Sequence, residues 1–200
     1  MKQYVITLSR QFGSLGRTIA QQLAEELEID FYDRDIVEET AKRMDLPVSV
    51  ISSKEENSNN ALFKRQYPLG MGVSSMQDEI FGIQTNIIRD LAKRESCIIV
   101  GRCADSILRD FENSLSVYIY APAEARLKNC TETLGMEEKE ARRMIREVDR
   151  SRELYHRRYC PEYNGPSTNK DLMIDSSAFG VEKTVEFLAY IARDRFGERG

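Results

Sequence analysis

The chain has 200 residues, of which 41% are hydrophobic and 31% charged, enough apolar material for one domain with a substantial core and a small inserted subdomain. Its net charge of −4 argues against a general nucleic-acid binder, and no apolar run approaches the roughly 18–20 residues that a membrane span requires. We therefore expect a cytoplasmic protein, without a signal peptide, that binds neither nucleic-acid polymers nor membranes.

The first predicted strand, residues 4–8, leads into a turn that contains Gly13 and Gly16, and a helical pattern follows over residues 19–27. A strand, a glycine-bearing turn and a helix N-terminus form the context in which backbone N–H groups bind phosphate. Glycines let the backbone approach an anion closely, and the helix dipole favours negative charge. The turn is therefore predicted to be a phosphate loop, with an ordinary connection between strand and helix as the alternative.

This turn departs from the phosphate-loop template G-x-x-x-x-G-K-[ST]. With Gly16 as the second glycine, Gln11 stands at the first glycine position and Arg17 at the lysine position. If the flanking segments are aligned without a gap to a loop of the type I-x-I-D-G-P-S-G-S-G-K-G-T, Gly16 itself falls on the lysine position. Because no lysine is present, Arg17 or Arg10 is expected to supply the positive charge, although arginine does not have the shape of lysine. Two hydroxyl groups at the start of the helix are candidate ligands for Mg²⁺: those of Ser14 and Thr18.

A second short strand, residues 29–33, ends in Asp33, and a helical pattern follows over residues 36–44. Open α/β sheets bind ligands at the carboxyl ends of their strands, so Asp33 is a candidate ligand-binding residue. Its carboxylate is equally suited to cap the next helix, and the sequence leaves both interpretations open. The polar stretch 52–75 is interpreted as a loop or part of a lid-like insertion, and apolar residues at 80–91 predict a core-facing helix.

An uninterrupted apolar run at residues 97–100 predicts a buried strand, and Arg102 follows it closely. A guanidinium group at that edge is suited to bind a phosphate or a base in a bidentate manner, with a surface ion pair as the alternative. Strands at 115–120 and 171–175 and a helix at 181–192 complete the chain. This alternation of strands and helices predicts a parallel sheet with helices on both faces.

Residues 137–159 form an uninterrupted, arginine-rich helical pattern, in which Arg142, Arg146 and Arg150 share one face. Ion pairs four residues apart on a solvated helix are the simplest explanation, but arginine is also the residue that clamps phosphates. The four cysteines show no C-x-x-C spacing, and only one histidine, His156, accompanies them. We therefore expect reduced, buried thiols and no zinc site.

In this order the segments resemble the P-loop nucleoside monophosphate kinases, and in particular the cytidylate kinase-like bacterial proteins whose loop reads S-R-Q-[FY]-G-S-x-G. The matching segments extend over nearly the whole chain: 9–18 (the loop), 31–33 (the entry to the monophosphate-binding region), 100–102 (the strand that ends in G-R-D), 121–126 (the approach to the lid), 149–152 (D-R-x-R) and 174–177 (the closing strand). Two departures stand out, because the loop lysine is missing and Cys103 replaces the acidic residue of G-R-D.

The resemblance implies one domain over residues 1–200 with a three-layer α/β fold like that of P-loop NTPases, in which helices flank a parallel five-stranded sheet. It places a monophosphate-binding region at about 34–95 and a lid at about 124–160. It also implies that the protein moves the γ-phosphoryl group of ATP, with Mg²⁺, to a nucleoside monophosphate, with CMP or dCMP favoured. Either a monomer or a homodimer is expected.

The same resemblance, together with the loop pattern, assigns roles to individual residues. The residues expected to hold the donor phosphates of ATP are Arg10, Gly13, Ser14, Gly16, Arg17 and Thr18. Those expected to hold the acceptor are Asp33, Arg102, Asp149 and Arg152. Those expected to act on the transferring phosphoryl group are Arg17, Arg126, Arg142 and Arg146. Two other functions stay open: a kinase of another small acceptor on the same fold, and a nucleotide-binding regulatory protein with little catalysis.

Overall fold

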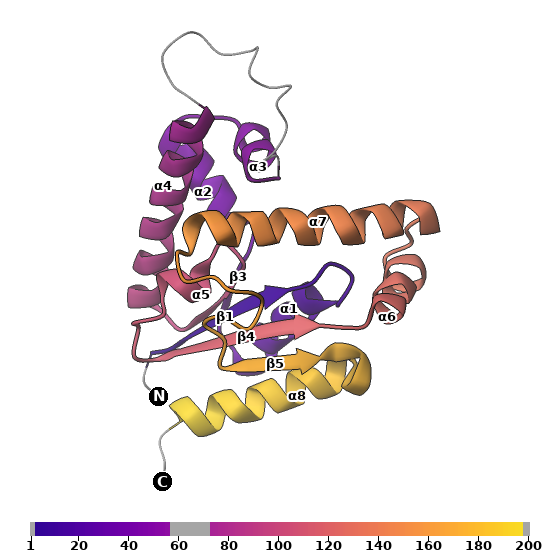
Figure 1. The fold of residues 1–200 in the computed structure, drawn as a ribbon. Helices are drawn as coiled ribbons and strands as arrows, with labels where there is room; N and C mark the ends of the chain where they lie inside the picture. Colours follow the sequence, from indigo (N-terminus) through magenta and orange to yellow (C-terminus); the bar gives the residue numbers. More distant parts are fainter. Residues whose placement is uncertain (1–2, 57–72, 198–200) are drawn as a thin grey trace.

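The fold is built on one parallel sheet. A computed structural model describes residues 3–56 and 73–197, and its strands lie in the order β2-β3-β1-β4-β5 (Figure 1). The strands are β1 (Val5–Arg10), β2 (Asp30–Tyr32), β3 (Cys97–Val100), β4 (Ser114–Tyr120) and β5 (Leu172–Asp175). Each strand pairs in parallel with its neighbour, so the carboxyl ends of the strands meet at one edge of the sheet.

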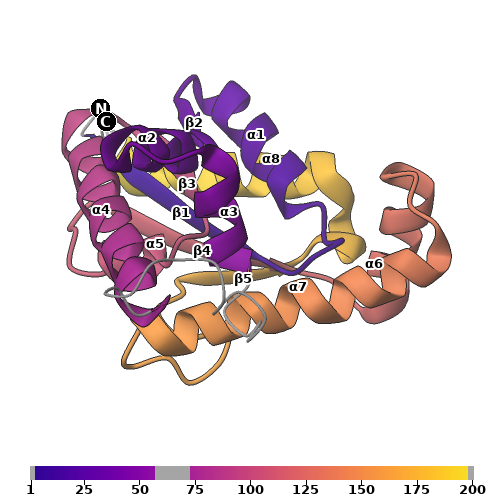
Figure 2. The same cartoon turned by 90° about the horizontal axis from the view of Figure 1, so that it is seen from above.

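Helices surround the sheet on both faces (Figures 1 and 2). They are α1 (Gly16–Leu27), α2 (Asp35–Met44), α3 (Val48–Glu56), α4 (Val73–Arg94), α5 (Ala104–Ile107), α6 (Ala123–Lys128), α7 (Glu138–Tyr159) and α8 (Ser176–Phe196), with a π-helical turn, η2 (Asn129–Thr133), after α6. Residues of α1 and α8 pack on one face of the sheet, and residues of α2, α4 and α5 pack on the other.

Alternating side chains of β1 divide the core between these two faces. Ile6 and Leu8 pack with α1 and α8, whereas Val5 packs with α4 and α5. This alternation is the period of two that a strand imposes on its side chains. A third and smaller cluster around Ile51 joins α2, α3 and α4, so these three helices form one unit beside the sheet.

The helix α7 runs along one side of the molecule, from α6 to the beginning of α4 (Figure 2). At its C-terminal end it packs on α4, where the rings of Tyr159 and Phe81 stack with their centroids 4.1 Å apart. The hydroxyl group of Tyr155 donates a hydrogen bond to the side-chain oxygen of Gln84 (3.2 Å). Aromatic stacking and a polar bond therefore hold this end of α7 in place.

The sheet and its flanking helices confirm the predicted α/β fold, but one segment differs from the prediction. Residues 52–56, expected in a polar loop, continue α3. The carbonyl oxygen of Pro47 accepts hydrogen bonds at the start of α3, and Ile51 is fully buried in it. Burial of Ile51 thus outweighs the modest helix propensity of the neighbouring serines. Residues 73–75 of that predicted loop belong to α4. The rest of it, residues 57–72, lies outside the described residues.

The two regions expected to close over substrates correspond to separate groups of helices. Residues 34–95 contain α2, α3 and α4, and residues 124–160 contain α7, η2 and most of α6. Their roles as monophosphate-binding region and lid stay predictions. Across the described part of the chain, no helix combines the length and the apolar character needed to cross a bilayer.

Candidate active site

The loop between β1 and α1 is fixed to the sheet by Gln11. Its backbone N–H donates to the carbonyl oxygen of Ile119 (3.0 Å), and its side-chain oxygen accepts from the backbone N–H of Ala121 (3.1 Å). A glycine, which the phosphate-loop template has at this position, cannot make the second bond. Sequence reasoning did not predict this contact, and the only signal for it was the departure of Gln11 from the template.

Ser14 lies buried beneath this loop. Its hydroxyl group donates to the carbonyl oxygen of Gln11 (2.9 Å), and its own carbonyl oxygen accepts from the hydroxyl group of Ser176 (2.7 Å). The next residue, Leu15, has a φ of 58°, in the left-handed region that a leucine side chain rarely adopts. Backbone strain of this kind persists only where the surrounding structure fixes it, which is common at ligand-binding loops.

Two glycines of the loop make room for neighbouring groups. A Cβ atom on Gly13, which has a φ of 77°, would lie 2.8 Å from the carbonyl oxygen of Arg126 and 2.9 Å from the sulfur of Cys130. A Cβ atom on Gly16 would lie 2.7 Å from the Cβ of Arg10. The absence of a side chain at Gly13 therefore allows α6 and η2 to approach the loop, and its absence at Gly16 leaves room for the side chain of Arg10.

Guanidinium groups from separate segments of the chain gather around Asp33 at the carboxyl edge of the sheet. Nε of Arg17 lies 2.6 Å from one carboxylate oxygen of Asp33, and Nη2 of Arg10 lies 3.9 Å from the other. Arg152 donates to the carbonyl oxygen of Arg10 (2.9 Å). Arg102, which follows β3, lies close enough for its charge to act on both Arg10 and Arg152.

The side chain of Arg10 is only 18% exposed at the centre of this cluster. Burial lowers the pKa of Arg10, and the charges of the three neighbouring arginines lower it further, while the carboxylate of Asp33 offsets part of the effect. Burial also lowers the pKa of Arg152. An anion bound among these groups would stabilise their charged forms, so the cluster is suited to bind phosphate or carboxylate.

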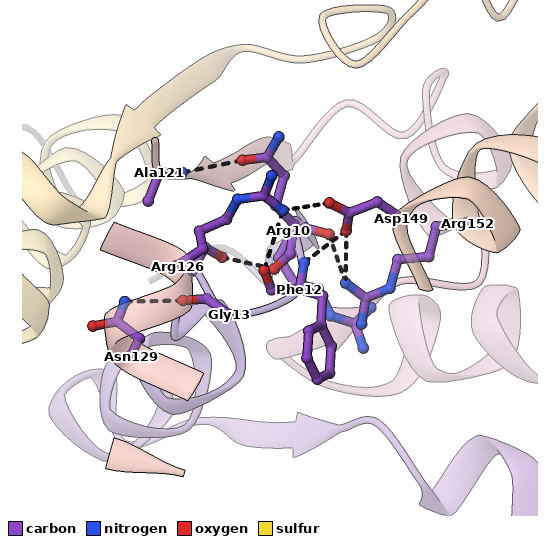
Figure 3. Close-up of polar contacts among 10 residues, drawn as sticks. Arg10, Phe12, Gly13, Ala121, Arg126, Asn129, Asp149 and Arg152 are labelled. Atoms are coloured by element: carbon purple, nitrogen blue, oxygen red, sulfur yellow. Dashed lines mark hydrogen bonds and ion pairs between the residues drawn. The ribbon is translucent and has the colours of Figure 1, made fainter. Parts of the chain in front are cut away.

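Residues of α6, η2 and α7 contact the loop through several polar bonds (Figure 3). Asp149 of α7 accepts a hydrogen bond from the backbone N–H of Phe12 (2.7 Å) and forms an ion pair with Arg126 of α6. Arg126 also donates to the carbonyl oxygen of Phe12 (3.3 Å). The side-chain amide of Asn129 donates to the carbonyl oxygen of Gly13 (2.9 Å). The carboxylate of Asp149 thus occupies a backbone N–H of the predicted phosphate loop.

Replacing Asp149 with alanine is expected to lower the free energy of unfolding by about 2 kcal/mol, because Arg126 is 9% exposed and would keep a largely buried charge without its partner. Urea unfolding followed by circular dichroism measures this change. Glu138→Ala is the matched control, since Glu138 pairs with Arg142 on the exposed face of α7 and should matter little. Equal effects of the two substitutions would contradict the prediction.

The structure tests one of the two interpretations of Asp33, the capping of α2. The N-cap residue of α2 is Arg34, which makes no capping hydrogen bond through its side chain, and Asp33 binds Arg17 instead. The capping interpretation is therefore wrong. Asp33 lies at the edge where ligands of open α/β sheets bind, and its role in holding the acceptor stays a proposal.

Two of the arginines expected to act on the transferring phosphoryl group lie away from the loop contacts. Arg142 and Arg146 are exposed on α7, and Arg142 pairs with Glu138 four residues earlier (2.7 Å). The other two, Arg17 and Arg126, contact Asp33 and the loop, respectively. The ion pair four residues apart, which is the simplest explanation of the arginine-rich pattern, is therefore present between Arg142 and Glu138.

Of the two hydroxyl groups considered for Mg²⁺, that of Thr18 fits the ion better. Thr18 is exposed in the first turn of α1, and Mg²⁺ prefers oxygen ligands while it keeps several waters. Ser14 is fully buried, and its hydroxyl group is bound to Gln11. We therefore keep Thr18 as the proposed ligand, whereas the observed contacts of Ser14 stabilise the loop.

All four cysteines are buried and free, as expected, but the structure also brings two of them together with the histidine. Cys103, His156 and Cys160 place their potential ligand atoms within 4.8 Å of one another. Cys103 follows β3, whereas the other two lie four residues apart at the end of α7. Their proximity therefore arises from the tertiary fold, which the spacing of the cysteines along the chain does not reveal.

A parallel sheet in this order, flanked by helices, with a loop that joins β1 to α1 at the carboxyl edge, has the fold of P-loop kinases. A gluconokinase from Sinorhizobium meliloti has this fold with a TM-score of 0.54 and 14% identity, over 98% of each chain. A shikimate kinase from Acinetobacter baumannii in complex with shikimate has a TM-score of 0.51 and 15% identity, over 98% of this chain and 96% of that chain. At such identities the likeness concerns the fold alone.

Residues 5–178 match the model of the cytidylate kinase-like family, and the chain belongs to this family of kinase-like phosphotransferases. An uncharacterized protein from Eubacterium ventriosum is 29% identical, with a TM-score of 0.73, over 96% of this chain and all of that one. Among curated proteins, none matches the chain.

Proposed function

We propose that the protein transfers the γ-phosphoryl group of ATP to a nucleoside monophosphate, with CMP or dCMP as the favoured acceptor. The observation that carries the proposal is the cluster of arginines around Asp33 at the carboxyl edge of the sheet, beside the loop before α1. Ligands of open α/β sheets bind at this edge, and guanidinium groups bind phosphate with two parallel hydrogen bonds. Membership of the cytidylate kinase-like family favours a pyrimidine nucleotide.

In this proposal the loop and the N-terminus of α1 hold the phosphates of ATP. Arg10 and Arg17 supply the positive charge that a lysine provides in the phosphate-loop template. When bound through Thr18, Mg²⁺ would neutralise charge on the donor phosphates. Phosphoryl transfer needs little covalent chemistry from the protein, so positioning and charge neutralisation are enough to account for catalysis.

The acceptor would lie on the other side of Arg10. Arg102 and Arg152 would hold its phosphate, and the carboxylates of Asp33 and Asp149 are suited to accept hydrogen bonds from its hydroxyl and amino groups. Arg126 already contacts the loop, and the other lid arginines, Arg142 and Arg146, would approach the transferring group when the lid closes. Closure of the lid would exclude water and limit wasteful hydrolysis of ATP.

Two other functions have observations in their favour. A cluster of guanidinium groups binds a carboxylate as readily as a phosphate, and the fold is shared with a gluconokinase and a shikimate kinase, so another small anionic acceptor is the second candidate. A regulatory protein that binds nucleotide without turnover is the third. The missing lysine and the engagement of the Phe12 N–H by Asp149 favour it.

The deciding experiment measures ADP formation from Mg·ATP with CMP, dCMP, UMP, AMP, GMP or no acceptor. ADP formation that depends on a cytidine monophosphate, together with a CDP or dCDP product, is the expected result. ATP binding by calorimetry without turnover of any nucleotide would overturn the proposal. In that case shikimate, gluconate and other hydroxylated acids are tested next, and activity with one of them would establish the second candidate.

Gly101→Ala is expected to reduce this activity at least ~10-fold while costing only about 1–2 kcal/mol of stability. Gly101 has a φ of 77°, and a Cβ atom there would lie 2.5 Å from Nη1 of Arg10, so the flexible end of that side chain must move. Gly135→Ala is the matched control, because Gly135 has a φ of 66° and no atom within 4 Å of the new Cβ. Gly135→Ala should lower the stability by a similar amount, measured by thermal unfolding. Its activity, measured by steady-state kinetics, should match that of the wild-type protein.

A further inference from the structure

Three potential metal ligands meet where the C-terminal end of α7 reaches the segment after β3. The sulfur atoms of Cys103 and Cys160 and a ring nitrogen of His156 lie within 4.8 Å of one another. Both cysteines are buried, and neither is part of a disulfide. In a tetrahedral zinc site with Zn–S bonds of ~2.3 Å, two sulfur atoms lie about 3.8 Å apart. A small contraction of the cluster is therefore enough to bind an ion.

A backbone carbonyl group holds one ring nitrogen of His156, as is usual for metal-binding histidines. Its Nδ1 lies 3.0 Å from the carbonyl oxygen of Arg152. Because a carbonyl oxygen only accepts hydrogen bonds, Nδ1 carries a proton, and Nε2 is the nitrogen left to bind a metal, which would displace any proton that Nε2 donates to Asp105 in the metal-free protein. A bond of this kind fixes the tautomer and the direction of the ring, which is how proteins prepare a histidine to bind a metal.

The surroundings of Nε2 also fit a tetrahedral ion. Oδ1 of Asp105 lies 3.4 Å from Nε2 of His156, which is long for a hydrogen bond. Two neighbouring ligands of a tetrahedral zinc ion, a nitrogen and an oxygen with bonds of ~2.0 Å, lie about 3.3 Å apart. The 3.4 Å separation is therefore compatible with both groups binding one ion.

The charges of the buried groups balance when a dication is present. Lys170 already neutralises Asp105, because the two form an ion pair in which each side chain is 3% exposed. The thiolates of Cys103 and Cys160 would then face a doubly charged cation, and the cluster would be neutral as a whole. Sulfur and imidazole ligands select zinc over Mg²⁺, which prefers oxygen.

We infer that Cys103, His156 and Cys160 form a zinc site, with its fourth position taken by Asp105 or by water. The site is independent of the proposed function and of the proposed magnesium ligand Thr18. It joins the segment directly after Arg102 to the end of α7, the helix that also holds Arg152. A bound ion would therefore fix the lid helix relative to the arginine cluster, which is a structural role and not a catalytic one.

The test is a titration of the full-length protein, kept reduced with a phosphine and freed of metal with a chelator. Zinc is added in competition with a chromophoric chelator, and Co²⁺ is added separately as a spectroscopic probe. We expect one zinc ion per chain, and with Co²⁺ a thiolate-to-metal charge-transfer band together with the visible bands of tetrahedral cobalt. Cys103→Ser and Cys160→Ser should each weaken zinc binding at least ~10²-fold.

Cys97→Ser and Cys130→Ser are the matched controls, because they remove the other two buried thiols and should leave the titration unchanged. Zinc should also raise the melting temperature of the wild-type and control proteins but not of the two cluster variants. If those variants fail to fold, the cobalt spectrum of the wild-type protein decides. No zinc uptake, a cobalt spectrum without the charge-transfer band, or a Cys103–Cys160 disulfide in place of bound zinc would overturn the inference.

Discussion

Replacing Arg10 with alanine is expected to slow ATP-dependent phosphoryl transfer by at least ~10²-fold, the scale on which the removal of one preorganised donor acts. Its guanidinium group lies at the centre of the arginine cluster and is largely buried, so water cannot take over its charge. Arg17, the candidate that the loop alignment placed at the lysine position, is 57% exposed and engaged with Asp33. We therefore expect a smaller loss for Arg17→Ala than for Arg10→Ala.

Single-turnover kinetics with saturating ATP and acceptor separate this effect from changes in binding. Arg193→Ala is the control for the removal of an arginine, because Arg193 pairs with Glu26 on the exposed surface between α8 and α1. Its turnover should match that of the wild-type protein. A larger loss for Arg17→Ala than for Arg10→Ala would restore the assignment made from the loop alignment.

Replacing Lys170 with methionine is expected to lower the free energy of unfolding of the metal-free protein by ~3–5 kcal/mol, because it leaves the buried carboxylate of Asp105 without its ammonium partner. Denaturant unfolding measures the loss. Lys183→Met is the control, since the ion pair of Lys183 with Glu186 is 60% exposed on both sides and should contribute almost nothing. A cost for Lys170→Met no greater than that of the control would show that Asp105 is neutral or solvated.

The ion pair between Lys170 and Asp105 also predicts how the stability of the protein changes at acidic pH. Burial alone would raise the pKa of Asp105, but the hydrogen bond with His156 and the charge of Lys170 outweigh burial and lower it. A carboxyl group with a lowered pKa stabilises the folded protein above its unfolded pKa of ~3.9, and this contribution is lost as the pH falls through the folded pKa. The midpoint of acid unfolding should therefore move to higher pH in Lys170→Met.

The general architecture could be predicted from the sequence because it depends on local patterns. The apolar run at residues 97–100 and the alternation of strands with helices predict the parallel sheet. A charged amphipathic pattern predicts α7. The position of Asp33 at a strand end likewise placed it at the correct edge of the sheet. Such features need only the period of a helix or strand and the rule for where strands end.

The details of the site depend on contacts between distant residues, and these left no local signal. Asn129 donates to the carbonyl oxygen of Gly13, 116 positions earlier, yet it is an ordinary polar residue within a helical pattern. Cys103 and Cys160 meet only because the end of α7 returns to the strand that precedes Cys103. Spacing rules for cysteine detect pairs within one turn or loop, so they do not detect this pair.

The hydrogen bond from the N–H of Phe12 to Asp149 would compete with a phosphate that binds to the loop. In the proposed function, any donor phosphate that binds this N–H first displaces a carboxylate that is already attached to the chain. The apparent affinity for ATP is then the intrinsic affinity multiplied by the fraction of molecules in which Asp149 has left the loop. If that contact is worth about 1.4 kcal/mol, it lowers the apparent affinity about tenfold. The contact would thus raise the nucleotide concentration at which half of the loops have bound a donor phosphate.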